Sequence, residues 1–215
     1  MSGSHMIFVR HGETTANSDE IAHGQTESPL NERGEQQAQH TADRLKRWER
    51  TYHRIYASPL KRAHRTAEII QSQLSLPLHS HAGLMEGFLG DWEGVTYAEL
   101  DRLGFGKRSI ADDDFDDHGG ESPNQLSRRV YDALLEIRAL HPGENIIVVS
   151  HGAAISHGLS RVLGTKPAFG YQYMMHNSAV TEVAWHPEPA LEVLNEHDHL
   201  PQELRASLER RDQKR

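Results

Sequence analysis

The sequence predicts an α/β protein that has a mostly parallel sheet with helices on both faces. Short apolar runs alternate with segments whose apolar residues recur every three or four positions, which is typical of strands alternating with helices. The run Ile146 to Val149 is apolar throughout, as expected of a parallel strand covered on both faces. The 215 residues contain no evident linker or repeat, so we expect a single domain over residues 6–215.

The first half of the predicted fold consists of two strands and two helices. Ile7 to Val9 is the first strand, and a helix beginning near Asn31 follows it. Arg54 to Ala57 is the second strand, after which Ser58 is predicted to cap a helix with Pro59 in its first position. Each helix has one apolar face, made of Ala38, Ala42, Leu45 and Trp48 in the first and of Ala63, Ala67, Ile70 and Leu74 in the second.

The second half adds a helix, the strand at 146–149, another helix and a last strand. Ser122, followed by Pro123, is expected to start the first of these helices, and Gly164 to end the second. Ala179 to Trp185 is predicted as a strand at an edge of the sheet, where it could pair with a second chain. Both helices have apolar faces, made of Leu126, Val130, Leu134 and Ile137 in the first and of Ile155, Leu159 and Val162 in the second.

The segment from about Gly87 to Gly120 differs from the rest. It is rich in glycine and aromatic residues, which predicts a small cap that is inserted over the sheet and is not a second domain. It also contains an acidic cluster of five aspartates between Asp112 and Asp117. This cluster is interpreted as a solvated loop. The alternative is that it repels highly charged substrates or attracts one that carries an ammonium group.

Composition excludes several classes of protein. The net charge of −8 provides no basic field for a nucleic-acid backbone. No apolar run approaches the roughly 18 residues of a membrane span, and we expect a cytoplasmic protein without a membrane partner. The sequence contains no cysteine, which excludes disulfides and a thiolate nucleophile. Met1 to His5 are interpreted as the remnant of an expression tag.

The 16 histidines are interpreted as mostly exposed imidazoles. Two pairs have a spacing that can bind a metal: His79 with His81, and His197 with His199. Both pairs lie in polar segments, so we expect neither to hold a functional metal.

Polar residues suited to phosphate follow three of the predicted parallel strands. Arg10-His11-Gly12 follows the first, Ser58 with Arg62 one turn later follows the second, and Ser150-His151-Gly152 follows the strand at 146–149. The carboxyl ends of parallel strands lie at one edge of a sheet, where ligands bind. Two imidazoles and two guanidiniums are therefore expected around one point, close to helix N-termini, in a site that binds a phosphoryl group without metal.

These residues resemble the motifs of the histidine phosphatase superfamily, which includes the cofactor-dependent phosphoglycerate mutases. The matching segments run in the family's order and cover most of the chain: Arg10-His11-Gly12-Glu13-Thr14 with Asn17; Gly24 with Ser28 to Gly34; Ala57-Ser58-Pro59-Leu60-Lys61-Arg62-Ala63; Leu84-Met85-Glu86 with Gly90-Asp91-Trp92-Glu93-Gly94; Gly119-Gly120-Glu121-Ser122; and Val149-Ser150-His151-Gly152.

The resemblance implies a role for each site residue. His11 would be the nucleophile that carries the phosphoryl group, and Glu86 would donate a proton to the leaving oxygen and then activate water. Arg10, Arg62 and His151 would hold the phosphoryl oxygens. Asn17, Gly24 and Gly152 would assist in substrate binding, and His23 is a candidate substrate contact beside Gly24.

The family contains phosphatases and mutases, and the length of the insertion favours hydrolysis. The phosphoglycerate mutases carry a longer insertion after the acid and a covering tail, whereas 32 residues separate Glu86 from Gly119 here. We therefore expect a metal-independent phosphatase of small phosphomonoesters, without a cofactor. The alternatives are a phosphoglycerate mutase, which would need a bisphosphate primer, and a non-catalytic binder of phosphorylated ligands. A small phosphorylated metabolite is the expected partner, for a monomer or a homodimer.

Overall fold

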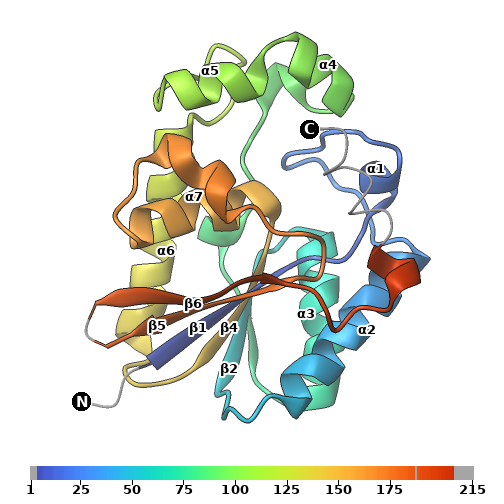
Figure 1. The fold of residues 1–215 in the computed structure, drawn as a ribbon, viewed down its shortest axis with the longest axis vertical. Coiled ribbons are helices and arrows are strands. Elements are labelled where there is room, and N and C mark those ends of the chain that lie inside the picture. Colours follow the sequence, from blue (N-terminus) through green and yellow to red (C-terminus); the bar gives the residue numbers. More distant parts are fainter. Residues whose placement is uncertain (1–3, 187, 206–215) are drawn as a thin grey trace.

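The structure is a computed structural model and describes residues 4–186 and 188–205. One six-stranded sheet forms its centre, in the order β3-β2-β4-β1-β5-β6 (Figure 1). The strands are β1 (Ser4–Arg10), β2 (Arg54–Ala57), β3 (Leu78–Ser80), β4 (Ile146–Ser150), β5 (Val180–Trp185) and β6 (Pro189–Glu196). β1 to β4 run parallel to one another. β5 pairs antiparallel with β1 on one side and with β6 on the other. The predicted α/β fold with a mostly parallel sheet is confirmed.

Helices cover both faces of this sheet. α2 (Glu32–Arg47) and α3 (Lys61–Leu74) pack on one face, and α6 (Pro123–Leu140) and α7 (Gly152–Val162) pack on the other (Figure 1). Successive residues of a strand point to opposite faces, so Ile7 and Val9 join the core under α2 and α3, while Met6 and Phe8 join the core under α6 and α7. This double coverage explains why β1 and β4 are apolar runs without alternation.

The shorter elements lie mainly at one end of the molecule. They are α1 (Thr15–Ser18), η1 (Ala82–Leu84), η2 (Gly90–Trp92), α4 (Tyr97–Arg102), α5 (Phe105–Ala111) and η3 (Pro167–Tyr173). The segment 87–120 contains η2, α4 and α5, and Figure 1 shows α4 and α5 at the end of the molecule opposite to the start of β1. None of the described helices has the length and apolar character that crossing a lipid bilayer requires.

The acidic cluster is more structured than a solvated loop. The Asp113 carboxylate accepts a hydrogen bond from the backbone N–H of Ala168 at 2.6 Å, which joins the segment to η3. Asp114 accepts from the side chain of Asn124 on α6, and Asp117 pairs with Arg108. Two of the five carboxylates, those of Asp113 and Asp114, therefore attach the segment to the body of the protein, although all but Asp113 are exposed as expected of a solvated loop.

Other expectations need correction. α3 begins at Lys61, so its N-cap residue is Leu60 and not Ser58. The Ser58 hydroxyl contacts Nε2 of His151 at 2.8 Å and accepts from the N–H of Leu60 at 3.3 Å, while the Glu27 carboxylate accepts from the N–H of Lys61 at 3.1 Å. β5 is not an edge strand, since the unpredicted β6 covers it. β3, whose three residues Leu78–Ser80 are too few to show a pattern, was also not predicted.

The two chain ends are described only in part. β1 extends to Ser4 and His5, which pair with Trp185 and Ala184, so two residues assigned to a tag remnant are part of the sheet. Most of the tail after Leu200 falls in 206–215, outside the described residues.

Helix α6 depends on its predicted cap, which gives a stability test. The Ser122 hydroxyl accepts from the N–H of Gln125, and the Gln125 side-chain oxygen accepts from the N–H of Ser122. Ser122→Ala should lower the free energy of unfolding by about 1 kcal/mol in urea titration. Ser122→Gly should lower it by only a few tenths of a kcal/mol. Equal stability of the alanine variant and the wild type would contradict the cap.

Candidate active site

The ends of β1, β2 and β4 meet at one point, as the parallel sheet requires. The N–H of His11 donates to the carbonyl of Ser150 at 3.0 Å, and the N–H of Ser58 donates to the carbonyl of Val149 at 3.0 Å. The rings of His11 and His151 consequently lie with their centroids 5.1 Å apart. The structure thus brings together the two imidazoles that the sequence places 140 positions apart, from residue 11 to residue 151.

His11 is buried and oriented by its own loop. Its Nδ1 lies 2.7 Å from the carbonyl of Gly12, which can only accept, so Nδ1 carries the hydrogen and Nε2 of the neutral ring has the lone pair. Burial, followed by the charges of Arg62 and Arg10, holds the pKa of His11 well below its usual range. The side chain is therefore an uncharged imidazole at neutral pH.

The loop after His11 packs tightly against the start of α2. A Cβ on Gly12 would lie 2.3 Å from the carbonyl oxygen of Gly34, so no side chain fits there. The N–H of Gly12 donates to the hydroxyl of Thr66 on α3, and the N–H of Glu13 donates to Gln37 on α2. Two helices thus fix the backbone that carries the imidazole.

Arg62 links the other site residues. Its guanidinium donates from Nη2 to the carbonyl of Gly24 at 2.6 Å, from Nη1 to that of Thr26 at 3.1 Å, and from Nε to Nδ1 of His151 at 3.2 Å. Because Nδ1 of His151 accepts, its Nε2 carries the hydrogen and donates to the Ser58 hydroxyl at 2.8 Å. Burial, then the charge of Arg62, holds the pKa of His151 well below its usual range.

Arg10 approaches from the end of β1. Its Nη1 donates to the carbonyl of Met175 at 2.6 Å. A Cβ on Gly152 would lie 3.3 Å from the Arg10 guanidinium carbon, so the absence of a side chain at the start of α7 lets the cation lie against the backbone. Arg10 also lowers the pKa of His11.

Glu86 lies at the amino end of α7. Its carboxylate accepts from the N–H groups of Ala154 at 2.8 Å, Ala153 at 3.2 Å and Gly87 at 3.0 Å. The N-terminus of a helix has unpaired N–H groups and a positive dipole end, which favour a negative charge. The carboxylate and the two imidazoles are therefore held by elements that begin at the same sheet edge.

Asn17 and His23 come from the segment between β1 and α2. The Asn17 side-chain oxygen accepts from Asn177, whose amide also donates to the His11 carbonyl. His23 is 8 % exposed, its ring centroid lies 6.4 Å from that of His11, and its Nε2 has no hydrogen-bond partner among the described residues. Burial, then the charge of Arg62, lowers the pKa of His23 to about 4.

The structure adds residues to which the sequence assigned no role. Asn177 bridges His11 and Asn17, although it belongs to no motif, and only its place in the fold reveals it. Glu93 accepts from the N–H groups of Gln25 and Thr26, which fixes the loop whose carbonyls bind Arg62. Glu93 was visible as part of a motif, but its partner loop lies 67 positions away, from Thr26 to Glu93.

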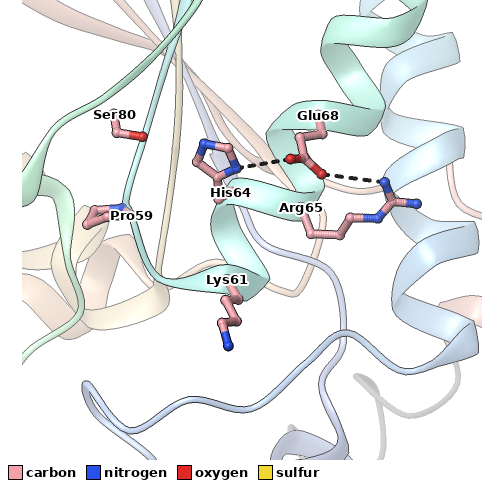
Figure 2. A pocket seen from close by; sticks show the side chains of 6 residues that line it. All are labelled: Pro59, Lys61, His64, Arg65, Glu68 and Ser80. Atoms are coloured by element: carbon pink, nitrogen blue, oxygen red, sulfur yellow. Dashed lines mark hydrogen bonds and ion pairs between the residues drawn. The ribbon is translucent and has the colours of Figure 1, made fainter.

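A hollow of about 460 Å³ lies beside the first turns of α3 (Figure 2). It is lined by Pro59, Lys61, His64, Arg65, Glu68 and Ser80. Glu68 pairs with His64 at 3.3 Å and with Arg65 at 3.5 Å. None of these six lining residues belongs to the site around His11.

One group with the donor atoms of a metal site is found among residues 4–186 and 188–205. His5, His186 and Glu192 have ligand atoms within 4.8 Å of one another, at the opposite end of β1 from His11. Arg50 already pairs with Glu192 at 3.2 Å, so a cation would compete with its guanidinium. The group includes neither of the histidine pairs noted in the sequence.

The low pKa of His23 predicts how stability depends on pH. The folded-state pKa is below the unfolded value of about 6.5, so the unfolded chain binds more protons and stability falls as the pH drops below that value. Through His23 alone, the free energy of unfolding should decrease by about 2 kcal/mol between pH 7.5 and pH 5. In urea titrations at both pH values, the free energy of unfolding of His23→Gln should decrease by about 2 kcal/mol less than that of the wild type. An identical loss would contradict the burial of a neutral His23.

Comparison with known proteins identifies the family of this chain. The profile of the histidine phosphatase superfamily (branch 1) matches residues 6–197. The chain is 35 % identical over 162 residues to the uncharacterized phosphatase PhoE of Bacillus subtilis, covering 75 % of this chain and 79 % of that protein. It is 33 % identical over 181 residues to the probable phosphoglycerate mutase GpmB of Salmonella paratyphi C, with 83 % of each chain covered.

A solved structure shows the same fold. A phosphoserine phosphatase mutant from Entamoeba histolytica in complex with phosphoserine superposes with a TM-score of 0.83 and 30 % identity, over 92 % of this chain and all of that one. The profile match spans every residue of the site described above. The protein therefore belongs to branch 1 of the histidine phosphatase superfamily.

Proposed function

We propose that this enzyme hydrolyses small phosphomonoesters without metal, through a phosphohistidine on His11. The observation that carries the proposal is the state of His11: a buried neutral imidazole with Nδ1–H bound to the Gly12 carbonyl, beside Arg10, Arg62 and His151. An imidazole in this state can attack phosphorus through Nε2. The neighbouring cations supply the charge neutralisation that phosphoryl transfer requires.

The reaction has two steps. Nε2 of His11 forms a bond to phosphorus while the bond to the ester oxygen breaks, and protonated Glu86 gives its proton to that oxygen. Water then attacks phosphorus, the Glu86 carboxylate takes a proton from it, and the bond to His11 breaks to release phosphate. The negative charge of the arriving phosphoryl group favours the protonated acid in the first step. The three N–H donors hold the carboxyl group in place through both steps.

Hydrolysis is favoured over mutase activity by the short segment over the site. Residues 87–120 form only the 3-residue η2, the 6-residue α4 and the 7-residue α5. A mutase must exclude water while the phosphohistidine exists, which requires a more extensive cover. The phosphoserine bound by the Entamoeba relative supports a small phosphorylated metabolite as the substrate. We also propose Asn17, His23, Gly24 and Gly152 as substrate contacts. Gly24 binds Arg62, Gly152 lies against Arg10, His23 lies beside His11, and Asn17 is linked to the His11 carbonyl through Asn177.

Phosphate release tests the reaction class. The wild type should release phosphate from several phosphomonoesters, such as O-phosphoserine, 3-phosphoglycerate and p-nitrophenyl phosphate, equally with and without EDTA. No turnover across the panel, or a strict requirement for added metal, would reject the proposal.

Trapping of the intermediate tests the nucleophile. Rapid quench with ³²P-labelled substrate should give acid-labile phosphate on the wild type, and His11→Ala should abolish both the adduct and turnover. His64→Ala is the matched control, because His64 lines the hollow of Figure 2 with its side chain 36 % exposed, and it should retain both. Ligand binding without an adduct would instead identify a non-catalytic binder.

The mutase alternative is tested by product analysis. With 3-phosphoglycerate and a bisphosphate primer, a mutase would form 2-phosphoglycerate faster than phosphate. We expect phosphate to be the main product, with no stimulation by the primer. Primer-stimulated isomerisation that outruns hydrolysis would overturn the assignment as a phosphatase.

A further inference from the structure

The backbone that carries Glu86 is held by an arginine from α6. Arg129 donates from Nη1 to the carbonyls of Gly83 and Met85, both at 3.0 Å, and from Nη2 to the carbonyl of Glu86 at 3.1 Å. One guanidinium therefore contacts three carbonyls within four consecutive residues. Two further side chains reach the same segment, since the Ser150 hydroxyl donates to the carbonyl of Leu84 at 2.7 Å and the Gln25 amide donates to that of Glu86 at 3.0 Å.

Glu121 completes this arrangement from the other side. Its carboxylate forms a two-point pair with Arg129, at 2.7 Å from Nε and 2.6 Å from Nη2. The same carboxylate accepts from the N–H of Phe88 at 3.0 Å, and the N–H of Glu121 donates to the Phe88 carbonyl at 2.8 Å. The pair thus holds the backbone on both sides of Glu86.

Helix α6 positions both residues. Glu121 directly precedes the cap Ser122, and Arg129 lies two turns further along the helix. α6 also packs against α7, whose Ala153 and Ala154 N–H groups bind the Glu86 carboxylate. The backbone of Glu86 and its carboxylate are consequently both fixed relative to α6.

We infer that Arg129 and Glu121 are positioning residues that hold Glu86 in the geometry for proton transfer. This inference rests on the role proposed for Glu86 above. The planar guanidinium has donors on two edges, so it can bind a carboxylate on one edge and carbonyls on another, whereas lysine offers a single point of charge. A small displacement of a catalytic group, of about 1 Å, can cost as much as about 100-fold in rate.

The chemistry of the leaving group distinguishes this role from general stabilisation. An acid accelerates departure of a basic oxygen strongly and that of a weakly basic oxygen little. Phenyl phosphate and p-nitrophenyl phosphate have nearly the same shape, but p-nitrophenolate leaves without protonation. The value of kcat/KM reports the steps up to formation of the phosphohistidine, so it is sensitive to the acid and not to the later activation of water.

The experiment compares both esters in Arg129→Lys, Arg129→Gln and Glu121→Gln. For phenyl phosphate we expect kcat/KM to fall by about 10- to 100-fold, and for p-nitrophenyl phosphate by less than about threefold. The phosphohistidine should also accumulate with p-nitrophenyl phosphate, because Glu86 activates water less well in the second step. Glu121→Gln keeps the size of the side chain and one acceptor oxygen. It therefore tests the positioning role even if the arginine variants do not fold.

A matched control exists at the other end of the sheet. Arg54 and Glu144 form a two-point pair at 2.5 and 2.8 Å, with side chains 22 % and 28 % exposed, compared with 25 % and 20 % for Arg129 and Glu121. In Arg54→Lys and Arg54→Gln, kcat/KM for both esters should stay within about twofold of the wild-type value, because this pair is remote from Glu86.

Glu86→Gln separates failure of this inference from failure of the proposed function. If Glu86→Gln discriminates between the two esters and the Arg129 and Glu121 variants lose activity equally on both, the positioning role is overturned and the acid role stands. If Glu86→Gln itself loses activity equally on both esters, the acid role is overturned, and the positioning role with it.

Discussion

The site depends on one buried cation. The Arg62 side chain is among the largest fully buried ones, and the three groups it contacts, the carbonyls of Gly24 and Thr26 and Nδ1 of His151, are all uncharged. Burying a charge is costly unless it is hydrogen-bonded or paired. The hydrogen bonds reduce that cost without cancelling the positive charge, so the field of Arg62 extends into the site. Burial is the main cause of the low pKa values of His11, His151 and His23, and the field of Arg62 lowers them further. The same field attracts an anion to this point.

The carbonyls that bind Arg62 are placed by a second charged residue. Glu93 accepts from the N–H groups of Gln25 and Thr26, so the loop presents its carbonyls on one side and its N–H groups on the other. Gly24 adopts a φ of +40° there, and a Cβ would lie 2.3 Å from a Glu93 oxygen. A side chain at position 24 would therefore separate Glu93 from the loop whose carbonyls bind Arg62.

Glu86 is held in place by the two helices α6 and α7. The start of α7 binds the carboxylate, and α6 holds the adjacent backbone through Arg129. Nucleophile, cation and acid are thus each attached to a different rigid element: the end of β1, the first turn of α3, and the α6–α7 layer. Catalytic groups on rigid elements keep their mutual geometry without reorganisation during the reaction.

The sequence by itself determined the strands with long apolar runs, the helices with regular apolar faces, and the residues that meet at the sheet edge. It did so because burial on two faces leaves a continuous pattern in the chain, and because parallel strands present their carboxyl ends together. Only the tertiary structure decided the short strand β3, the partner of Ser58, and the contacts of Asn177, Glu93 and Arg129. Those depend on hydrogen bonds between segments far apart in the chain, such as that between Arg129 and Gly83, and a local pattern carries no record of the distant partner.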